Sequence, residues 1–157
     1  MRAGIALGSN LGDRHALLSR ALKSLREIHE DETGPFLESS CFETEPEDCP
    51  PDSPLFLNSV AELETSRHPL ELMKLLQDLE TAAGRPVHHG RHLPRFLDLD
   101  LLYCDEMTLD APGLQLPHPR INERLFVLKP LAEIRPDLQL PTWNYPCSEY
   151  LRCILNK

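Results

Sequence analysis

One expected β-strand organises the interpretation of this sequence: Arg95-Phe96-Leu97-Asp98-Leu99-Asp100-Leu101-Leu102-Tyr103. Apolar residues recur at every second position, as in a strand that buries one face. The predicted buried face consists of Leu97, Leu99, Leu101 and Tyr103. Asp98 and Asp100 then share the opposite face, about 7 Å apart along the strand.

Two neighbouring carboxylates on one strand face need a positive partner. At an effective dielectric constant of about 20 and a separation near 5 Å, their repulsion is roughly 3 kcal/mol. A hard cation such as Mg²⁺ removes this repulsion, and it often takes one or two carboxylates together with substrate phosphates. The alternative is that both acids face water on a half-exposed antiparallel strand.

The segment before this strand is strongly basic. No acidic residue lies between Thr81 and Leu97, although the chain has 25 of them, and segment 85–95 holds three arginines and three histidines. Arginine binds phosphate oxygens through paired hydrogen bonds and keeps its charge. With no G-x-x-x-x-G-K-[ST] motif in the sequence, we expect side chains and metal to hold any nucleotide. A solvated basic loop is the alternative.

Length and composition indicate one domain over residues 1–157. The net charge of −9 argues against nonspecific nucleic-acid binding. Neither a signal peptide nor an apolar run of membrane-spanning length is apparent. The five cysteines form no C-x-x-C pair, which favours a reducing cytoplasm over a disulfide framework or a zinc site. Without an evident exposed apolar stripe, a monomer is expected.

The order of the expected elements indicates the fold. Strands are predicted at 3–7, 36–45, 56–64 and 95–103, and helices from a cap at Asp13 to an end among residues 30–34 and from Pro69 to a stop at Gly84. This order is that of the split βαβ, ferredoxin-like fold of the α+β class. We therefore expect an antiparallel sheet with both helices on one face and loops covering a ligand cleft on the other.

The remaining chain is expected to form shorter elements. A turn is predicted at 110–113, an extended proline-locked segment at 114–120, a helix capped by Asn122, and a last helix at 147–155.

A series of short motifs runs from residue 5 to about residue 138. They are Leu7-Gly8-Ser9-Asn10-Leu11-Gly12-Asp13, Phe42-Glu43-Thr44-Glu45-Pro46, Phe56-Leu57-Asn58, Glu80-x-x-x-Gly84-Arg85, Pro94-Arg95-Phe96-Leu97-Asp98-Leu99-Asp100-Leu101-Leu102, Pro117-His118-Pro119-Arg120 and Glu123-Arg124-x-Phe126-Val127-Leu128-x-Pro130-Leu131. In this order and spacing, the sequence resembles the 6-hydroxymethyl-7,8-dihydropterin pyrophosphokinase family of folate biosynthesis.

The resemblance implies one reaction with two small-molecule substrates. The hydroxymethyl oxygen of the pterin attacks the β-phosphorus of ATP, which gives AMP and the pterin diphosphate. Two Mg²⁺ ions would bridge Asp98, Asp100 and the triphosphate. The implied catalytic residues are Arg85, Arg91, Arg95, Asp98 and Asp100.

The resemblance also implies two sets of binding residues. Those for the nucleotide are Gln77, Glu80, Leu101, Leu114, Gln115, His118 and Arg124. Those for the pterin are Thr44, Phe56, Asn58, Arg95 and Phe126. Alternative roles are a surface or helix-end position for Gln77 and Glu80, and an ordinary core position for Leu101 and the two phenylalanines.

Three departures from the family pattern bear on affinity. Val87 replaces a frequent second arginine, His92 a frequent tryptophan, and Glu47-Asp48 a small apolar residue followed by glycine. We expect weaker binding of ATP or pterin with the reaction kept. The competing hypotheses are a non-catalytic pterin- or nucleotide-binding relative and a purely structural interaction domain. The aspartate pair favours the enzyme, because a binding module would not need it.

Overall fold

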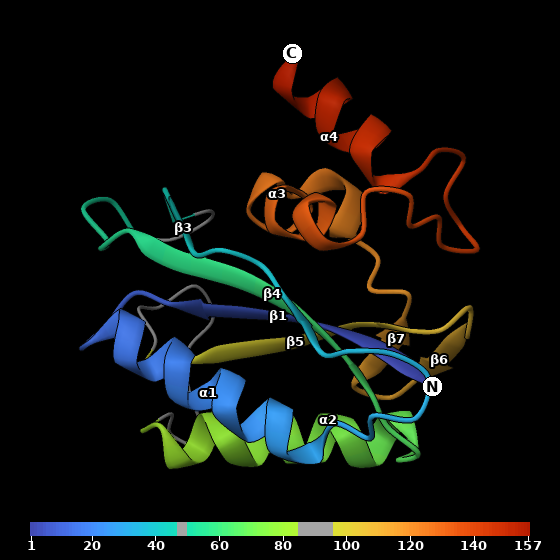
Figure 1. The fold of residues 1–157 in the computed structure, drawn as a ribbon. Helices are drawn as coiled ribbons and strands as arrows, with labels where there is room; N and C mark the ends of the chain where they lie inside the picture. Colours follow the sequence, from blue (N-terminus) through green and yellow to red (C-terminus); the bar gives the residue numbers. More distant parts are fainter. Residues whose placement is uncertain (47–49, 85–95) are drawn as a thin grey trace.

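The computed structural model describes residues 1–46, 50–84 and 96–157, which form an antiparallel sheet with four α-helices and a small hairpin (Figure 1). The strands are β1 (Arg2–Ser9), β2 (Leu37–Glu38), β3 (Phe42–Thr44), β4 (Phe56–Glu64), β5 (Asp98–Cys104), β6 (Leu109–Ala111) and β7 (Leu114–Leu116). The α-helices are α1 (Arg14–Ile28), α2 (Pro69–Ala82), α3 (Leu125–Ile134) and α4 (Cys147–Leu155).

The main sheet has the strand order β2-β4-β1-β5, and β3 also pairs with β4. β1 lies in the middle and is antiparallel to both neighbours, β4 and β5. The single strand predicted at 36–45 is wrong, since β2 and β3 are separated by residues 39–41. The Ser39 hydroxyl accepts a hydrogen bond from the backbone N–H of Val60 at 2.9 Å, so a side chain takes a place that a strand carbonyl would fill.

A β-bulge changes the face of the last residues of β5. Ile5 on β1 pairs with Leu101, but Gly4 pairs with Tyr103, so Leu102 is the extra residue. Tyr103 therefore packs with the cluster on the α3 face, and the prediction that it shares a face with Leu101 is wrong. Gly4 makes room for it, because a Cβ there would lie 2.3 Å from the tyrosine ring.

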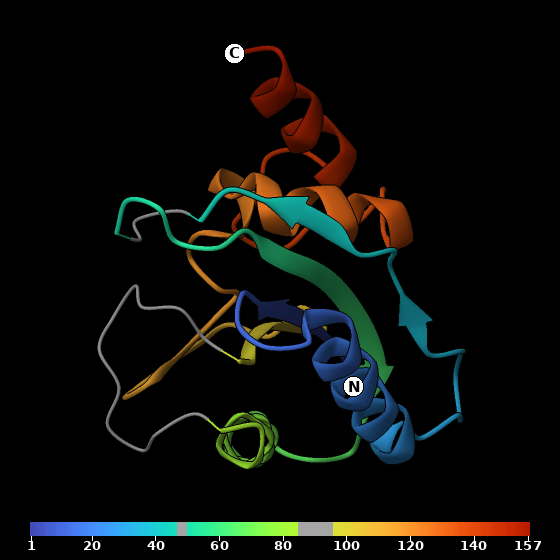
Figure 2. The same cartoon turned by 90° about the vertical axis from the view of Figure 1, so that its left-hand side faces the viewer.

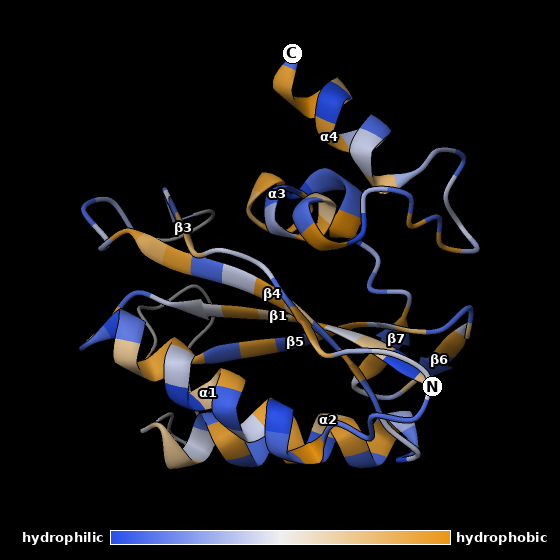
Figure 3. Cartoon of the chain, viewed as in Figure 1, coloured by the Kyte–Doolittle hydropathy of each residue, from blue (hydrophilic) through white to orange (hydrophobic). Residues whose placement is uncertain are grey.

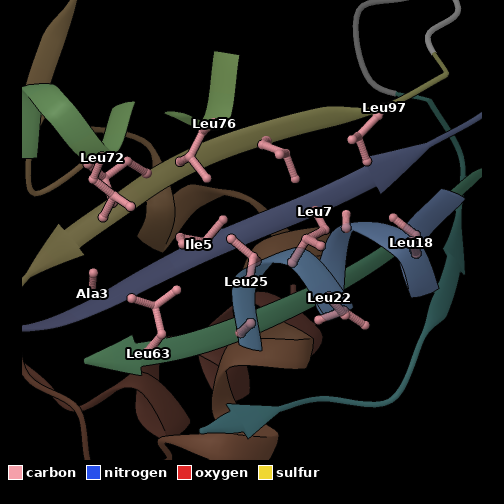
Figure 4. Packing of buried hydrophobic residues seen from close by; sticks show 14 of the residues in the cluster. Ala3, Ile5, Leu7, Leu18, Leu22, Leu25, Leu63, Leu72, Leu76 and Leu97 are labelled. Carbon is pink, nitrogen blue, oxygen red and sulfur yellow. The ribbon is translucent and has the colours of Figure 1, made fainter. Parts of the chain in front are cut away.

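Helices α1 and α2 cover one face of the sheet (Figures 1 and 2). The core between these layers contains Ile5 and Leu7 of β1, Leu25 of α1 and Leu76 of α2 (Figure 4). Both helices carry apolar and polar stretches, as expected for helices with one buried face (Figure 3).

The predicted start of α1 and both predicted ends of α2 are confirmed, but α1 ends at Ile28, before the expected end among residues 30–34. The Asp13 side chain accepts a hydrogen bond from the Ala16 N–H, which caps α1. Pro69 occupies the first turn of α2, and Gly84 follows the end of that helix with φ +107°. Such a positive φ favours glycine because it has no Cβ.

Helices α3 and α4 lie on the other side of the sheet (Figure 1). Val60, Leu102 and Tyr103 of the sheet pack there against an apolar cluster that includes Leu128 of α3 and Cys147 of α4. This face, where loops over a ligand cleft were expected, therefore also carries two helices.

The start of α3 also differs from its prediction. Asn122 lies inside a short 3-10 helix, Ile121–Glu123, and α3 begins at Leu125 after Arg124. The predicted turn at 110–113 is tighter, because Asp110 and Ala111 already belong to β6 of the β6–β7 hairpin. The predicted last helix is confirmed as α4.

A buried ion network ties α3 to the sheet. Glu62 of β4 is 1% exposed and accepts hydrogen bonds from Nε of Arg2 at 3.0 Å, Nη1 of Arg135 at 2.5 Å and the Tyr103 hydroxyl at 2.5 Å. Burial and the neighbouring Glu62 raise the pKa of Tyr103 well above its usual value, which keeps this hydroxyl a donor. Within the described ranges, no helix is long and apolar enough to cross a membrane.

Candidate active site

Gly8 of β1 is the centre of the candidate site. It pairs with Asn58 of β4 on one side and with Asp98 of β5 on the other. Directly opposed residues of antiparallel strands point to the same sheet face, and neighbouring strands lie about 4.8 Å apart. An amide and a carboxylate therefore stand on one face about 10 Å apart. The glycine between them has no side chain, so the sheet surface is recessed at this position.

Three of the residues expected to hold the pterin, Thr44, Phe56 and Asn58, lie on the β4 side of Gly8. Asn58 is 5% exposed, and its Nδ2 donates a hydrogen bond to Oγ1 of Thr44 at 2.5 Å. Thr44 of β3 pairs directly with Phe56, two residues before Asn58. A Cβ at Gly8 would lie 3.3 Å from Oδ1 of Asn58 and 3.5 Å from the Phe56 ring, so both side chains lean over the glycine.

Phe126 lies on α3, where it is half-buried against the apolar cluster under that helix. The guanidinium of Arg124 lies 5.5 Å from the centre of its ring. Such a contact between a cation and an aromatic face is attractive. The same pair was predicted to serve two different substrates, and in the fold the two residues form one surface.

The two acids of β5 line a pocket on the opposite side of Gly8. Asp98 and Asp100 are half-buried, and the pocket of about 650 Å³ lies between β5, α2 and the β6–β7 hairpin. The other lining residues that the sequence predicted are Gln77, Glu80, Leu101, Leu114, Gln115 and His118. One pocket thus gathers these nucleotide candidates beside both aspartates, whereas Arg124 lies outside its lining.

This arrangement suits an oxygen-liganded cation that keeps other ligands of its own. Among the described residues, no group of three or more histidine, cysteine, aspartate or glutamate side chains is placed to hold a metal. Two carboxylates on one face are what a Mg²⁺ ion uses when water and substrate phosphates complete its coordination. The donor set therefore fits magnesium brought with a nucleotide better than a permanently bound metal.

Glu80 connects α2 to β5, the strand that carries both aspartates. Its side chain is 8% exposed, and its Oε1 accepts a hydrogen bond from the backbone N–H of Leu99 at 2.7 Å. Leu99 lies between Asp98 and Asp100. Glu80 therefore fixes the position of both acids, in addition to lining the pocket.

His118 is held as a neutral donor. Its backbone N–H donates to the carbonyl of Leu102 at 2.7 Å, and its Nδ1 accepts the backbone N–H of Arg120 at 3.2 Å. Burial, followed by the charges of Arg124 and Arg120, lowers the pKa of His118 below its usual 6.5. The neutral ring then carries its proton on Nε2, so any positive charge at this corner comes from the two arginines.

Leu101 and Leu114 are core residues that also line the pocket, and their proposed contact with adenine stays a prediction. They belong to the apolar core between the sheet and the α1–α2 layer, and they also line the pocket. Their exposed fractions, 5% and 7%, are small enough for core residues. A planar apolar ligand such as adenine could contact only their edges.

The family of the chain follows from its sequence. Residues 4–136 match the model of the 7,8-dihydro-6-hydroxymethylpterin-pyrophosphokinase (HPPK) family. The chain belongs to this family. It is 41% identical over 140 residues to the 2-amino-4-hydroxy-6-hydroxymethyldihydropteridine pyrophosphokinase of Pseudomonas aeruginosa, covering 89% of this chain and 84% of that protein. To the enzyme of that name from Bacillus subtilis it is 44% identical over 132 residues, covering 84% and 77%.

A solved HPPK structure shares the fold. The wild-type HPPK-DHPS of Plasmodium falciparum, crystallised with pteroate, superimposes with a TM-score of 0.74 at 13% identity over 99% of this chain. The present chain spans 42% of the length of that protein.

Some HPPK residues predicted from the sequence lie outside the described residues. They are Arg85, Arg91 and Arg95, together with the departures Val87, His92 and Glu47-Asp48. For these positions the predictions stay predictions.

The sequence does not predict the place of Gly8 at this site. A glycine at a strand position often marks a close approach of other groups, and here the side chains of Asn58 and Phe56 approach it. The contacts of Arg14 with residues about 30 and 40 positions away likewise correspond to no sequence pattern.

Proposed function

We propose that this chain transfers the pyrophosphoryl group of ATP to 6-hydroxymethyl-7,8-dihydropterin, a step of folate biosynthesis. The observation that carries the proposal is the alignment of Asn58, Gly8 and Asp98 across three strands. It puts an amide suited to a pterin and a carboxylate suited to a metal-bound phosphate chain on one surface.

The pterin half supplies stacking and hydrogen bonds. Phe56 and Phe126 are the proposed aromatic faces, and each well-placed aromatic contact contributes about 0.5–1.5 kcal/mol beyond burial. Asn58 can present its carbonyl oxygen and one amide hydrogen to the pterin edge, because its other amide hydrogen is donated to Thr44. These groups hold the hydroxymethyl carbon toward Gly8 and the acids.

The nucleotide half holds the triphosphate. Asp98 and Asp100 would bind two Mg²⁺ ions, which neutralise phosphate charge and polarise the β-phosphorus when present. Nε2 of His118 donates a hydrogen bond into the pocket without adding charge. Arg85, Arg91 and Arg95 are proposed to stabilise the charge that moves onto the departing AMP.

The reaction exchanges one phosphorus–oxygen bond for another. The hydroxymethyl oxygen bonds to the β-phosphorus, and the bond from that phosphorus to the oxygen shared with the α-phosphorus breaks. AMP leaves with the bridging oxygen, and the hydroxyl proton is released. Such transfers depend on alignment and electrostatic stabilisation more than on covalent participation of the protein.

The finer description of the fold belongs to the same proposal. We assign residues 1–157 to one ferredoxin-like domain that acts as a monomer in the cytoplasm. The strand order β2-β4-β1-β5 supports the fold assignment, as does the common side of α1 and α2 (Figure 2). The described cysteines, Cys41, Cys104, Cys147 and Cys153, are free thiols, as is usual in a reducing compartment.

Product analysis tests the proposal. Purified protein is incubated with ATP, hydroxymethyl-dihydropterin and Mg²⁺, and phosphorus NMR follows the nucleotides. We expect equal amounts of AMP and a pterin diphosphate, and no product after chelation of the metal. Formation of ADP would show single phosphoryl transfer instead. Binding of either substrate without turnover would support the non-catalytic relative.

A further inference from the structure

Arg14, the first residue of α1, joins two segments that flank the proposed pterin site. Its Nη1 donates a hydrogen bond to the carbonyl of Leu55 at 3.0 Å. Its Nη2 donates to Oε1 of Glu43 at 2.6 Å. Leu55 precedes β4, and Glu43 lies in β3, so one guanidinium bridges the end of one strand and the beginning of the next.

Both partners are direct neighbours of proposed pterin residues. Glu43 precedes Thr44, and Leu55 precedes Phe56. Thr44 and Phe56 are directly opposed in the β3–β4 pairing. Arg14 thus sets the spacing of the two strands at the place where they separate. A change of that spacing would move Thr44 and Phe56 relative to each other.

The position of Arg14 in its helix supports a tertiary role. A cation in the first turn of a helix opposes the helix dipole, so it does not stabilise α1 by itself. The backbone there is fixed, because the Asp13 side chain accepts the Ala16 N–H at 3.1 Å and the Asp13 carbonyl accepts the Leu17 N–H at 2.9 Å. The guanidinium therefore reaches its two partners from a rigid base.

We propose that Arg14 is a positioning residue that sets affinity for the pterin and leaves affinity for the nucleotide unchanged. The inference rests on the proposed function. The selective effect on the pterin follows from the location of Arg14. Its hydrogen bonds lie beside β3 and β4, whereas the nucleotide pocket lies beyond β5. Glu43 is 53% exposed and Arg14 26%, so water replaces part of the lost interaction and the effect is moderate.

The test compares two arginines of the same helix. Arg14→Ala removes the bridge. Arg26→Ala removes a similar exposed contact near the other end of α1, where Arg26 pairs with Glu38 of β2. Steady-state turnover gives KM for each substrate and kcat. Thermal unfolding shows how far each variant remains folded.

For Arg14→Ala we expect a threefold to tenfold rise in KM for the pterin, by an order-of-magnitude estimate from exposed charged hydrogen bonds of about this strength. KM for ATP and kcat at saturation should stay within about twofold, as should all constants of Arg26→Ala. Arg14→Lys should recover part of the affinity, because it keeps one donor and the charge but loses the two-armed geometry.

The outcomes separate this inference from the function on which it rests. An unchanged pterin KM in an active Arg14→Ala enzyme would overturn the inference alone. Equal rises in both KM values, or the same rise in Arg26→Ala, would also overturn it, because they indicate general destabilisation. An inactive wild-type protein would overturn the proposed function and this inference together.

Discussion

Glu80 shows how one residue can serve the fold and the site. A buried carboxylate is costly unless hydrogen bonds satisfy it, and Glu80 accepts the Leu99 N–H at 2.7 Å. The sequence placed it near the nucleotide, with a helix-end role as the alternative. The structure puts it in the pocket lining and in contact with the strand that carries both acids.

Two substitutions at this position separate the hydrogen bond from the charge. Glu80→Ala removes the acceptor and should lower the free energy of unfolding by about 1–3 kcal/mol. Glu80→Gln keeps an acceptor oxygen and should lower the free energy of unfolding by less than half of that amount. Urea denaturation measures both. Asp78→Ala is the control, because it removes an exposed pair with Lys74 on the same helix and should change stability by less than about 1 kcal/mol. Equal losses in the two Glu80 variants would contradict the hydrogen-bond role.

At the scale of elements, the bulge between β1 and β5 is a feature that alternation alone could not predict. The side chains of β5 alternate between the two sheet faces as expected up to Leu101. The extra residue Leu102 then shifts the alternation, so that Tyr103 lies on the α3 face. The ring of Tyr103 occupies the space that a side chain at position 4 would fill. The bulge depends on Gly4, which lies about 100 residues away.

Gly4→Ala tests this dependence. The added methyl would meet carbons of the Tyr103 ring at 2.3–2.4 Å, too close for any real contact. Overpacking of this kind typically costs about 1–3 kcal/mol, so the midpoint of urea unfolding should fall. Gly34→Ala is a matched control, because the nearest atom to the added methyl would be Nη1 of Arg2 at 3.6 Å, an ordinary van der Waals contact. A Gly4→Ala protein as stable as the control would show that the bulge adapts.

Other elements show what sequence patterns can and cannot determine. Asp13, Pro69 and Gly84 act locally, so their positions at helix ends were predictable. The break between β2 and β3 was not, because it depends on a hydroxyl bonding to the opposite strand. Asn122 resembles a helix cap in sequence, but the 3-10 turn at Ile121–Glu123 delays the start of α3 to Leu125.

At the scale of the whole molecule, an acidic protein is proposed to bind a highly anionic substrate. The net charge is −9, so attraction must come from a local surface. The nucleotide candidates next to the acids could be predicted from motif order, and the structure gathers most of them in one pocket. Their distances could not be predicted, since they depend on how α2 and β7 pack against the edge of β5.

His118 should make the stability of the whole protein depend on pH. Its pKa is lowered by burial first and by Arg124 and Arg120 next, so below pH 6.5 the unfolded chain binds a proton that the folded chain resists. Stability contributed by this group is complete above pH 6.5 and falls as the pH drops toward the folded pKa. The slope can reach about 1.4 kcal/mol per pH unit.

His118→Gln should flatten this part of the profile. Urea unfolding of the metal-free and nucleotide-free protein between pH 7.5 and pH 5.5 measures it, by the linkage between proton binding and stability. His15→Gln, an exposed change on α1, should follow the wild type. Parallel curves for wild type and His118→Gln would contradict a neutral, buried imidazole.

The central claim is that the two acids of β5 bind metal together with the phosphates of ATP, on the sheet face that they share with Asn58. Crystals grown with Mn²⁺ and α,β-methylene ATP, which resists cleavage, test it directly by anomalous scattering. The account predicts manganese peaks that contact carboxylate oxygens of Asp98 and Asp100 and oxygens of the nucleotide. A bound nucleotide whose metal lies away from both carboxylates would contradict it.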